Sequence, residues 1–376
     1  MQDTSININK AAGNNMDFAD IGVMIIAGGK SSRMGKDKRF LTVDNCSLLE
    51  LTLQKTAQLS FAEAYLCGEC HQAEGLFELA KWYGLTLVAD KRQGAGPLEG
   101  LRAGLAHLQA EYALALSCDM PLFRYEVIRP LLAEARGEMA IIPVVNGRRQ
   151  PLAGLYHRDL LPTVEAALQR GDYKIGQVID SVPHKLVELG DNDAFFNVNR
   201  PSDFRLVQGR LVNEKRQVPL VTVSAPKSNT GKTTFIERLI PKLKERGLRV
   251  GVVKGDCHGY DVDEEGKDSY RFKQAGADGV AVVSPEGYFI QQKTEQRASL
   301  MEIAGRLTDV DLVIIESRSH GTIPKISLWR GLGEVIVDED TVAIFSSGEH
   351  GETSLRQYDI DDDEGAAQLV CFLCGL

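Results

Sequence analysis

Short apolar runs that alternate with amphipathic segments limit the fold of this sequence more than any other feature. In the first half of the chain, strand-like runs lie at residues 22–27, 64–67, 85–89, 112–117 and 139–143. Helical patterns lie between them at 47–59, 100–108 and 125–135. Strands that alternate with helices are typical of a parallel sheet covered on both faces. The pattern therefore predicts a doubly wound α/β domain.

A second series of the same kind begins near residue 220. Its strand-like runs lie at 220–223, 249–253, 279–283 and 311–316, with a helical pattern at 233–246. A polar, basic stretch without a strong apolar face, residues 205–217, precedes it. We expect a second α/β domain with a mainly parallel sheet. The predicted organisation is a flexible extension at 1–20, a first domain at 21–207, a linker at 208–217 and a second domain at 218–376.

The composition excludes several broad classes of function. The 376 residues include 43 basic and 52 acidic side chains, and the net charge of −9 argues against coating nucleic acid or an anionic membrane. No window approaches the roughly 20 apolar residues of a membrane span, and residues 1–20 do not resemble a signal peptide. Seven irregularly spaced cysteines do not make a disulfide framework. We expect a cytoplasmic protein with no nucleic-acid or membrane partner.

A glycine-containing loop directly follows the first strand-like run. Gly28 and Gly29 let the backbone approach a phosphate or a base closely. Arg33 and Lys38 add two cations that can neutralise a pyrophosphate leaving group in the transition state. The loop predicts a nucleotide site with transfer chemistry.

Polar residues at three later places extend this candidate site. Asp119 follows a buried strand, where an open α/β sheet places its ligands, and a carboxylate there can hold Mg²⁺; the alternative is a helix cap. Asn197 and Asn199 can bind a pterin or a phosphate, or form an ordinary turn. Arg149 and Gln150 lie in a polar loop that either meets an anionic acceptor or is simply solvated.

The segment from Ile26 to Lys38 reads Ile-Ala-Gly-Gly-x-x-x-Arg-Met-Gly-x-Asp-Lys and resembles the nucleotidyltransferase signature. In this form it is similar to the bacterial molybdenum cofactor guanylyltransferase family, MobA. Matching segments follow at Asp90, at Gly96-Pro-Leu-Glu-Gly, at Cys118-Asp-Met-Pro and at residues 196–201. The chain departs from the family at residues 67–71, Cys-Gly-Glu-Cys-His, where relatives often carry an asparagine.

The MobA resemblance implies a set of site residues and a reaction. GTP would bind at Ile26, Ala27, Gly28, Gly29, Gly35, Lys38, Gly68, Asp90, Gly96, Pro97 and Asp119. The catalytic residues would be Arg33, Lys38 and Asp119, with Asp119 as a metal ligand. The molybdopterin acceptor would meet Arg149, Gln150, Asn197 and Asn199. The implied reaction transfers GMP from GTP to molybdopterin with Mg²⁺ and releases pyrophosphate.

A second phosphate-binding motif opens the second domain. Residues 226–233, Pro-Lys-Ser-Asn-Thr-Gly-Lys-Thr, nearly fit the P-loop pattern, with Pro226 in place of the first glycine. In such a loop Lys232 reaches the β- and γ-phosphates and Thr233 holds Mg²⁺. The expected nucleotide-binding residues are Lys227, Ser228, Asn229, Thr230, Gly231, Lys232, Thr233 and Thr234.

Segments after the P-loop resemble the GTP-binding adaptor of the same pathway, MobB. The matching segments begin at Lys254, Gly266 and Gln274, and Glu316 and residues 324–326 continue the match. Asp256 and Glu316 are acidic ends of strands, and we expect them to be further Mg²⁺ ligands. The half contains no Asn-Lys-x-Asp guanine reader, so guanine preference follows from the resemblance alone.

Taken together, the resemblances cover the chain from about residue 21 and predict a MobA–MobB fusion. The alternative is a cytidylyl or sugar-phosphate nucleotidyltransferase fused to a P-loop GTPase switch. Weak GTPase activity is compatible with the second domain. The expected partners are GTP, molybdopterin and, transiently, molybdoenzymes or their chaperones; a homo-oligomer is compatible with the sequence.

Overall fold

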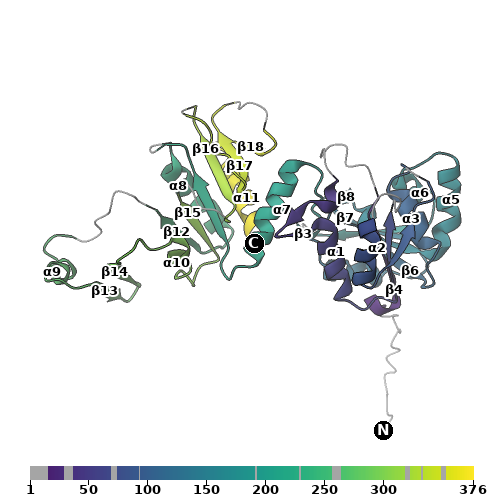
Figure 1. Cartoon of the computed structure of the whole chain (residues 1–376), viewed down its shortest axis with the longest axis horizontal. Helices are drawn as coiled ribbons and strands as arrows, with labels where there is room; N and C mark the ends of the chain where they lie inside the picture. The colour runs from purple at the N-terminus through teal and green to yellow at the C-terminus, as the bar shows by residue number, and fades with distance from the viewer. Residues whose placement is uncertain are drawn as a thin grey trace, which may run out of the picture. The chain divides into compact units, whose positions relative to one another are not determined.

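The protein folds into two compact units, Met1–Phe204 and Arg205–Leu376 (Figure 1). The computed structural model describes residues 16–28, 37–68, 74–92, 94–190, 193–227, 230–255, 264–317, 322–331, 333–348 and 353–376. Each unit has its own β-sheet with helices packed on it, so the predicted pair of α/β domains is confirmed. Within the described residues, no helix is long and apolar enough to cross a membrane.

The first unit is built on one mixed sheet. Its main strands, in spatial order, are β10 (His184–Leu189), β7 (Ala140–Val145), β9 (Leu155–His157), β6 (Tyr112–Ser117), β1 (Gly22–Ile26), β4 (Glu63–Gly68) and β5 (Thr86–Ala89). The pairs among β6, β1, β4 and β5 are parallel, as the sequence predicts. The short strand β9 was not predicted and pairs antiparallel with both β6 and β7. Because β9 is antiparallel to both neighbours, β6 and β7 run in the same direction.

Helices cover both faces of this sheet. They are α1 (Leu48–Ala57), α2 (Glu74–Trp82), α3 (Pro97–Leu105), α4 (Arg129–Leu132), α5 (Leu161–Gln169) and α6 (Ile175–Asp180). Alternate residues of β1 enter different hydrophobic cores: Ile25 packs in the core that contains residues of α1, and Ile26 in the core that contains residues of α3. Strand β1 is apolar at successive positions because both of its faces are buried under helices.

Helix α3 approaches β1 so closely that residue 104 has no room for a side chain and residue 100 has little. A Cβ atom on Gly104 would lie 2.3 Å from Sδ of the buried Met24, and one on Gly100 would lie 3.0 Å from Ile26. Real Cβ contacts are not that short, so a side chain at residue 104 would push the helix or Met24 out of place.

We expect Gly104→Ala to lower the free energy of unfolding by about 1–3 kcal/mol, the usual cost of overpacking a core. The matched control is Gly75→Ala on α2, where nothing lies within 4 Å of the added carbon. That change is expected to raise the free energy of unfolding by up to about 1 kcal/mol, because alanine favours a helix. Chemical denaturation of the full chain, followed by circular dichroism, measures both. Equal effects of the two changes would contradict the packing argument.

Helix α7 (Pro201–Glu214) contains the division between the two units and continues through most of the linker predicted at 208–217. Its second half is held by polar side chains. Arg210 is 6% exposed and donates to the carbonyl of Phe372 at 2.8 Å, and Asn213 donates to Leu373 at 2.9 Å. The sequence pattern showed no strong apolar face there because hydrogen bonds from buried polar groups make these contacts.

The second unit is built on a fully parallel sheet. Its strands, in spatial order, are β12 (Val250–Lys254), β15 (Leu312–Glu316), β11 (Leu220–Ser224), β16 (Lys325–Trp329), β17 (Thr341–Ser346) and β18 (Arg356–Asp359). Every pairing in it is parallel. The helices of this unit include α8 (Lys232–Glu245), α10 (Leu300–Ala304) and α11 (Asp363–Cys374). The acidic run at 359–364 ends β18 and begins α11, with Asp362 as its N-cap.

One predicted strand does not join this sheet. Residues 279–283 were expected to belong to the parallel sheet, but β13 (Gly279–Ser284) pairs antiparallel with β14 (Gly287–Gln292) as a separate hairpin. Helix α9 (Asp268–Gln274) packs next to it. Several apolar side chains of this region are exposed, Val283 at 80% among them. An apolar run of this length is typical of a buried strand in a parallel sheet. Here it forms an exposed hairpin, so the prediction for residues 279–283 was wrong.

Candidate functional site

Four neighbouring parallel strands of the first unit bring the predicted nucleotide residues to one edge of the sheet. The backbone N–H of Ala27, after β1, donates to the carbonyl of Cys67 on β4 at 2.7 Å. The N–H of Asp90, after β5, donates to the carbonyl of Gly68 at 3.1 Å. These bonds keep the chain ends of β1, β4 and β5 side by side, at the edge where open α/β sheets bind ligands.

The ends of β1 and β4 approach so closely that a side chain on residue 68 would crowd the backbone of Ala27. A Cβ on Gly68 would lie 3.2 Å from the carbonyl atoms of Ala27. Gly28 is also in this contact, since a Cβ there would lie 3.4 Å from Oδ2 of Asp90. The predicted residues 26–28, 68 and 90 therefore lie together in the structure.

Asp119 lies two residues after β6, at the same edge, and is 8% exposed. Its Oδ2 forms an ion pair with Nζ of Lys38, the first residue of a short 3₁₀ helix, Lys38–Phe40. Its Oδ1 is buried and has no hydrogen-bond partner among the described residues. A buried carboxylate oxygen without a partner is costly unless something binds it. This atom fits a hard cation such as Mg²⁺, which prefers oxygen ligands.

The segment with the two predicted asparagines reaches the same place. The N–H of Val198 donates to the backbone carbonyl of Asp119 at 2.9 Å, although the two residues are far apart in the sequence. Asn197 is half-buried and donates from Nδ2 to the carbonyl of Phe195 at 3.0 Å, while Asn199 is exposed. The structure therefore brings Asn197 and Asn199 to either side of a residue bonded to Asp119.

The acceptor loop predicted at Arg149 and Gln150 follows β7 at this edge of the sheet. Arg149 lies on the two-residue strand β8 (Arg148–Arg149), which pairs antiparallel with the end of β7. Its Nη1 donates to Oδ1 of Asp180 at 2.5 Å, and both side chains are exposed. The N–H of Gln150 donates to the carbonyl of Pro143 at 2.8 Å. Strand β9 separates β7 from β6, so this loop and Asp119 follow strands that are not neighbours.

Two charged residues that the sequence analysis did not select organise this edge. Glu99, fully buried in the first turn of α3, accepts hydrogen bonds from the N–H of Lys91 and from Nε of Arg102, at 2.9 and 2.8 Å. It thereby ties the segment after β5 to the helix that Gly96 caps and Pro97 begins. In the sequence, Glu99 looks like any solvated helix residue. Its burial depends on the tertiary structure, so no local pattern could have identified it.

Arg39 is the second such residue. Its Nη1 donates to the carbonyl of Ala27 at 2.9 Å, and its guanidinium also holds Asp37, with Nη2 at 2.6 Å from Oδ2. Partial burial works to raise the pKa of Asp37, but the hydrogen bonds and the charge of Arg39 outweigh it and keep that pKa below its usual value. Arg39 therefore links the residue after β1 to the residue before Lys38.

Several predicted residues lie outside the described part of the chain. They are Gly29, Arg33 and Gly35 of the glycine loop, Ser228 and Asn229 of the P-loop, and the metal ligand expected at Asp256. Among the residues that are described, no group of three or more His, Cys, Asp or Glu side chains gathers as a metal site. In the first unit, the described part of the chain therefore offers a metal one carboxylate, that of Asp119, with its unpartnered oxygen.

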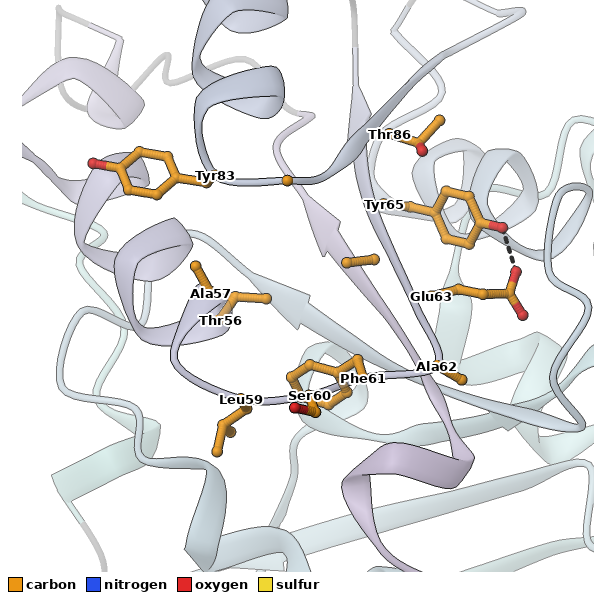
Figure 2. A pocket seen from close by; sticks show the side chains of 12 residues that line it. Thr56, Ala57, Leu59, Ser60, Phe61, Ala62, Glu63, Tyr65, Tyr83 and Thr86 are labelled. Atoms are coloured by element: carbon orange, nitrogen blue, oxygen red, sulfur yellow. Dashed lines mark hydrogen bonds between the residues drawn. The ribbon is translucent and has the colours of Figure 1, made fainter.

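A cavity of about 480 Å³ opens at the opposite edge of the sheet (Figure 2). It lies beside the end of α1 and the first residues of β4, and its lining includes Phe61, Tyr65 and Tyr83. The lining also contains the carboxylate of Glu63, which accepts a hydrogen bond from the Tyr65 hydroxyl. None of the predicted site residues lines this cavity, so it is separate from the edge that carries Asp119.

In the second unit, the P-loop joins β11 to α8. Gly231 has a left-handed backbone conformation with φ +88°, which favours glycine, and Lys232 begins α8. The Thr230 hydroxyl donates to the carbonyl of Lys227 at 2.7 Å, and Nζ of Lys232 lies 3.3 Å from the same oxygen. The loop therefore stands before a helix N-terminus, where backbone N–H groups and the helix dipole favour a phosphate.

The two predicted metal-binding residues of this unit that are described lie together. The hydroxyl of Thr233, in the first turn of α8, donates to Oε2 of Glu316 at 3.2 Å. Glu316 is the last residue of β15, which lies beside β11 in the sheet. Thr234 follows on α8 and is exposed. A hydroxyl and a carboxylate at this spacing fit a Mg²⁺ site.

Comparisons with known proteins divide the chain in the same order. The profile of the MobA-like NTP transferase domain matches residues 23–186, and that of molybdopterin guanine dinucleotide synthesis protein B, MobB, matches residues 220–347. The molybdopterin-guanine dinucleotide biosynthesis adapter protein of Escherichia coli K12 is 36% identical over 42% of this chain and 93% of its own length. A probable molybdenum cofactor guanylyltransferase of Halalkalibacterium halodurans is 33% identical over 49% of this chain and 94% of its own length. A molybdenum cofactor guanylyltransferase of Campylobacter jejuni is 28% identical over 52% of this chain and 100% of its own length.

Proposed function

Because the chain belongs to the molybdenum cofactor guanylyltransferase (MobA) family in its first unit and to the MobB adapter family in its second, we propose that its first unit transfers GMP from GTP to molybdopterin. It is a nucleotidyltransferase and a bifunctional protein of molybdopterin guanine dinucleotide biosynthesis. The proposal concerns the substrates and the residues that act on them. The second unit is proposed to bind GTP at its P-loop.

The observation that carries the transfer proposal is the edge at which Lys38, Asp119 and the asparagine segment meet. In the proposed reaction, a phosphate oxygen of molybdopterin attacks the α-phosphorus of GTP. The bond from that phosphorus to the oxygen bridging the α- and β-phosphates breaks, and pyrophosphate leaves with the bonding electrons. The acceptor is already an anionic phosphate, so the proposal includes no general base. Positioning and charge neutralisation are the contributions of the protein.

Each residue has one proposed role in this reaction. Lys38 neutralises the phosphates of GTP, together with Arg33, which lies outside the described residues. Gly28 and Gly68 let the ends of β1 and β4 lie close together where the nucleotide would bind, which their close contacts support. Asn197 and Asn199 orient the acceptor beside Asp119. The acceptor role of Arg149 and Gln150 remains a prediction.

Asp119 is the proposed holder of Mg²⁺ in the first unit, and its buried, unpartnered Oδ1 supports that assignment. When bound, the ion would supply positive charge against the α-phosphate. Lys38 already engages the other oxygen of the same carboxylate, which orients the carboxylate for this role. In the second unit, Thr233 and Glu316 are the proposed metal-binding pair.

The second unit is proposed to act as a GTP-binding adaptor with weak GTPase activity. The name of its E. coli relative supports the adaptor role, and the P-loop before α8 supports nucleotide binding. Transient contact with molybdoenzymes or their chaperones and a cytoplasmic location are part of the same proposal. Guanine selection is also proposed here, on the strength of the family alone.

The test is Mg²⁺-dependent release of pyrophosphate from GTP, ATP and CTP, each with and without molybdenum-loaded molybdopterin. We expect release from GTP only, and only when the pterin is present. Release from CTP would replace GMP transfer by CMP transfer to the same acceptor. Release that does not depend on the pterin, or no release from any nucleotide, would contradict the proposed reaction.

A further inference from the structure

We propose that Arg330 is a phosphate-binding residue of the P-loop, and that it contacts the α- and β-phosphates of the nucleotide from within the same chain. The inference deepens the GTP-binding function proposed for the second unit and rests on it. Arg330 directly follows β16, the neighbour of β11 in the sheet, so it stands at the same edge as the loop.

The guanidinium of Arg330 lies against the P-loop glycine. A Cβ atom on Gly231 would lie 3.1 Å from Nε of Arg330 and 3.6 Å from its Nη2. Gly231 caps α8, whose first residue is Lys232. The guanidinium therefore lies beside the helix N-terminus that would receive the phosphates.

Gly333, three residues after Arg330, lies against the beginning of the loop. A Cβ on Gly333 would lie 3.5 Å from Cε of Lys227 and 3.7 Å from Cβ of Pro226. Nε1 of Trp329 donates to the carbonyl of Gly333 at 2.9 Å, which ties Gly333 to the last residue of β16. Trp329 and Gly333, on either side of Arg330, are thus held by a hydrogen bond, which keeps the backbone of Arg330 next to the loop.

The charge of Arg330 is available to a ligand. Arg330 is exposed, and within the described residues it makes no hydrogen bond or ion pair that would occupy the guanidinium. The nearby carboxylate of Asp361 is hydrogen-bonded to Nη1 of Arg238 at 2.6 Å, which is the main reason that its pKa is below the usual value, and the charge of Arg330 adds a smaller attraction without a hydrogen bond. A planar guanidinium with free N–H groups suits two phosphate oxygens at once.

The strand order decides which phosphates it meets. Strands β15 and β16 lie on opposite sides of β11, so Glu316 and Arg330 stand on opposite sides of the loop. Thr233 contacts Glu316, and these two residues would hold the metal ion that neutralises the terminal phosphates of a bound nucleotide. Arg330 therefore lies on the side away from the γ-phosphate, next to the α- and β-groups.

Calorimetric titration of the full chain with GTP and with GDP tests this placement. Because the first unit also binds GTP in our proposal, the P-loop site is defined as the one that Lys232→Ala removes. In Arg330→Ala, we expect the affinity of that site for GTP and for GDP to fall by the same factor, about tenfold or more. Arg330→Lys should lose less, because it keeps the charge and loses the planar fork.

Arg306→Ala is the matched control, since Arg306 is exposed and follows α10 away from the loop. It should bind both nucleotides like the parent, and all variants should unfold at the parent temperature without nucleotide. Unchanged binding in Arg330→Ala, or a loss confined to GTP, would overturn the inference while leaving GTP binding intact. A parent protein without a Lys232-dependent site would overturn the proposed function of the second unit, and this inference with it.

Discussion

Asp119→Asn is expected to reduce pterin-dependent release of pyrophosphate from GTP by on the order of a hundredfold to a thousandfold. The change removes the negative charge from a carboxylate that is 8% exposed and that pairs with Lys38. It also replaces one oxygen by an amide nitrogen, and the resulting neutral amide is a poor ligand for a hard cation. The loss should appear mainly in kcat, because the carboxylate and its metal ion are proposed to act in the transfer step at the α-phosphorus. Release of pyrophosphate at saturating GTP and pterin, with Mg²⁺ varied, measures it.

The control for this change is Asp159→Asn, at a carboxylate that is 66% exposed and follows β9. It should leave kcat and the Mg²⁺ dependence at the parent values. Thermal unfolding of both variants checks that Asp119→Asn still folds, because the change also alters the cost of the unpartnered Oδ1. A folded Asp119→Asn with parent activity would remove Asp119 from the proposed site.

Lys232→Ala is expected to weaken GTP binding at the second unit by about a hundredfold, since charge-assisted hydrogen bonds to phosphate are lost. Lys232 begins α8, and its Nζ now lies 3.3 Å from the carbonyl of Lys227, at the mouth of the loop. Calorimetry should then detect one fewer nucleotide site per chain. Pterin-dependent release of pyrophosphate should continue, because Asp119 and Lys38 belong to the other unit.

Lys242→Ala on the same helix is the matched control. Lys242 pairs with Glu245 one turn along α8 and lies outside the loop, so nucleotide binding should not change. An unchanged number of sites in Lys232→Ala would contradict GTP binding by the P-loop. Loss of pyrophosphate release in the same variant would mean instead that the second unit takes part in the transfer.

Local patterns in the sequence located many of the elements of the fold, although not all of them. Each of the nine strand-like runs coincides with a strand, and the helical patterns at 47–59 and 233–246 coincide with α1 and α8. Both phosphate-loop motifs follow a strand, and β11, the P-loop and α8 succeed one another as predicted. These features depend on residues that are close together in the chain. The spacing of the apolar residues indicates a helix or a strand, and glycine or proline indicates a turn.

The errors came where a pattern did not show which partner a segment would have. The apolar run at 279–283 was assigned to the parallel sheet, but its partner is the adjacent strand β14. The stretch at 208–214 appeared too polar to pack, yet Arg210 and Asn213 hydrogen-bond to α11, more than 150 residues later. Burial of polar groups is favourable only when their partners are in place, and the sequence does not show which partners those are.

The sequence by itself therefore determined two α/β domains, two phosphate-binding loops and the family of each half. Only the tertiary structure decided which side chains share a site: Val198 against Asp119, Thr233 against Glu316, and Arg330 against Gly231. The physical reason is that loop chemistry and strand period are local, whereas strand order decides which chain ends meet at one edge of a sheet. That order follows from packing across the whole domain, in which each contact joins residues far apart in the chain.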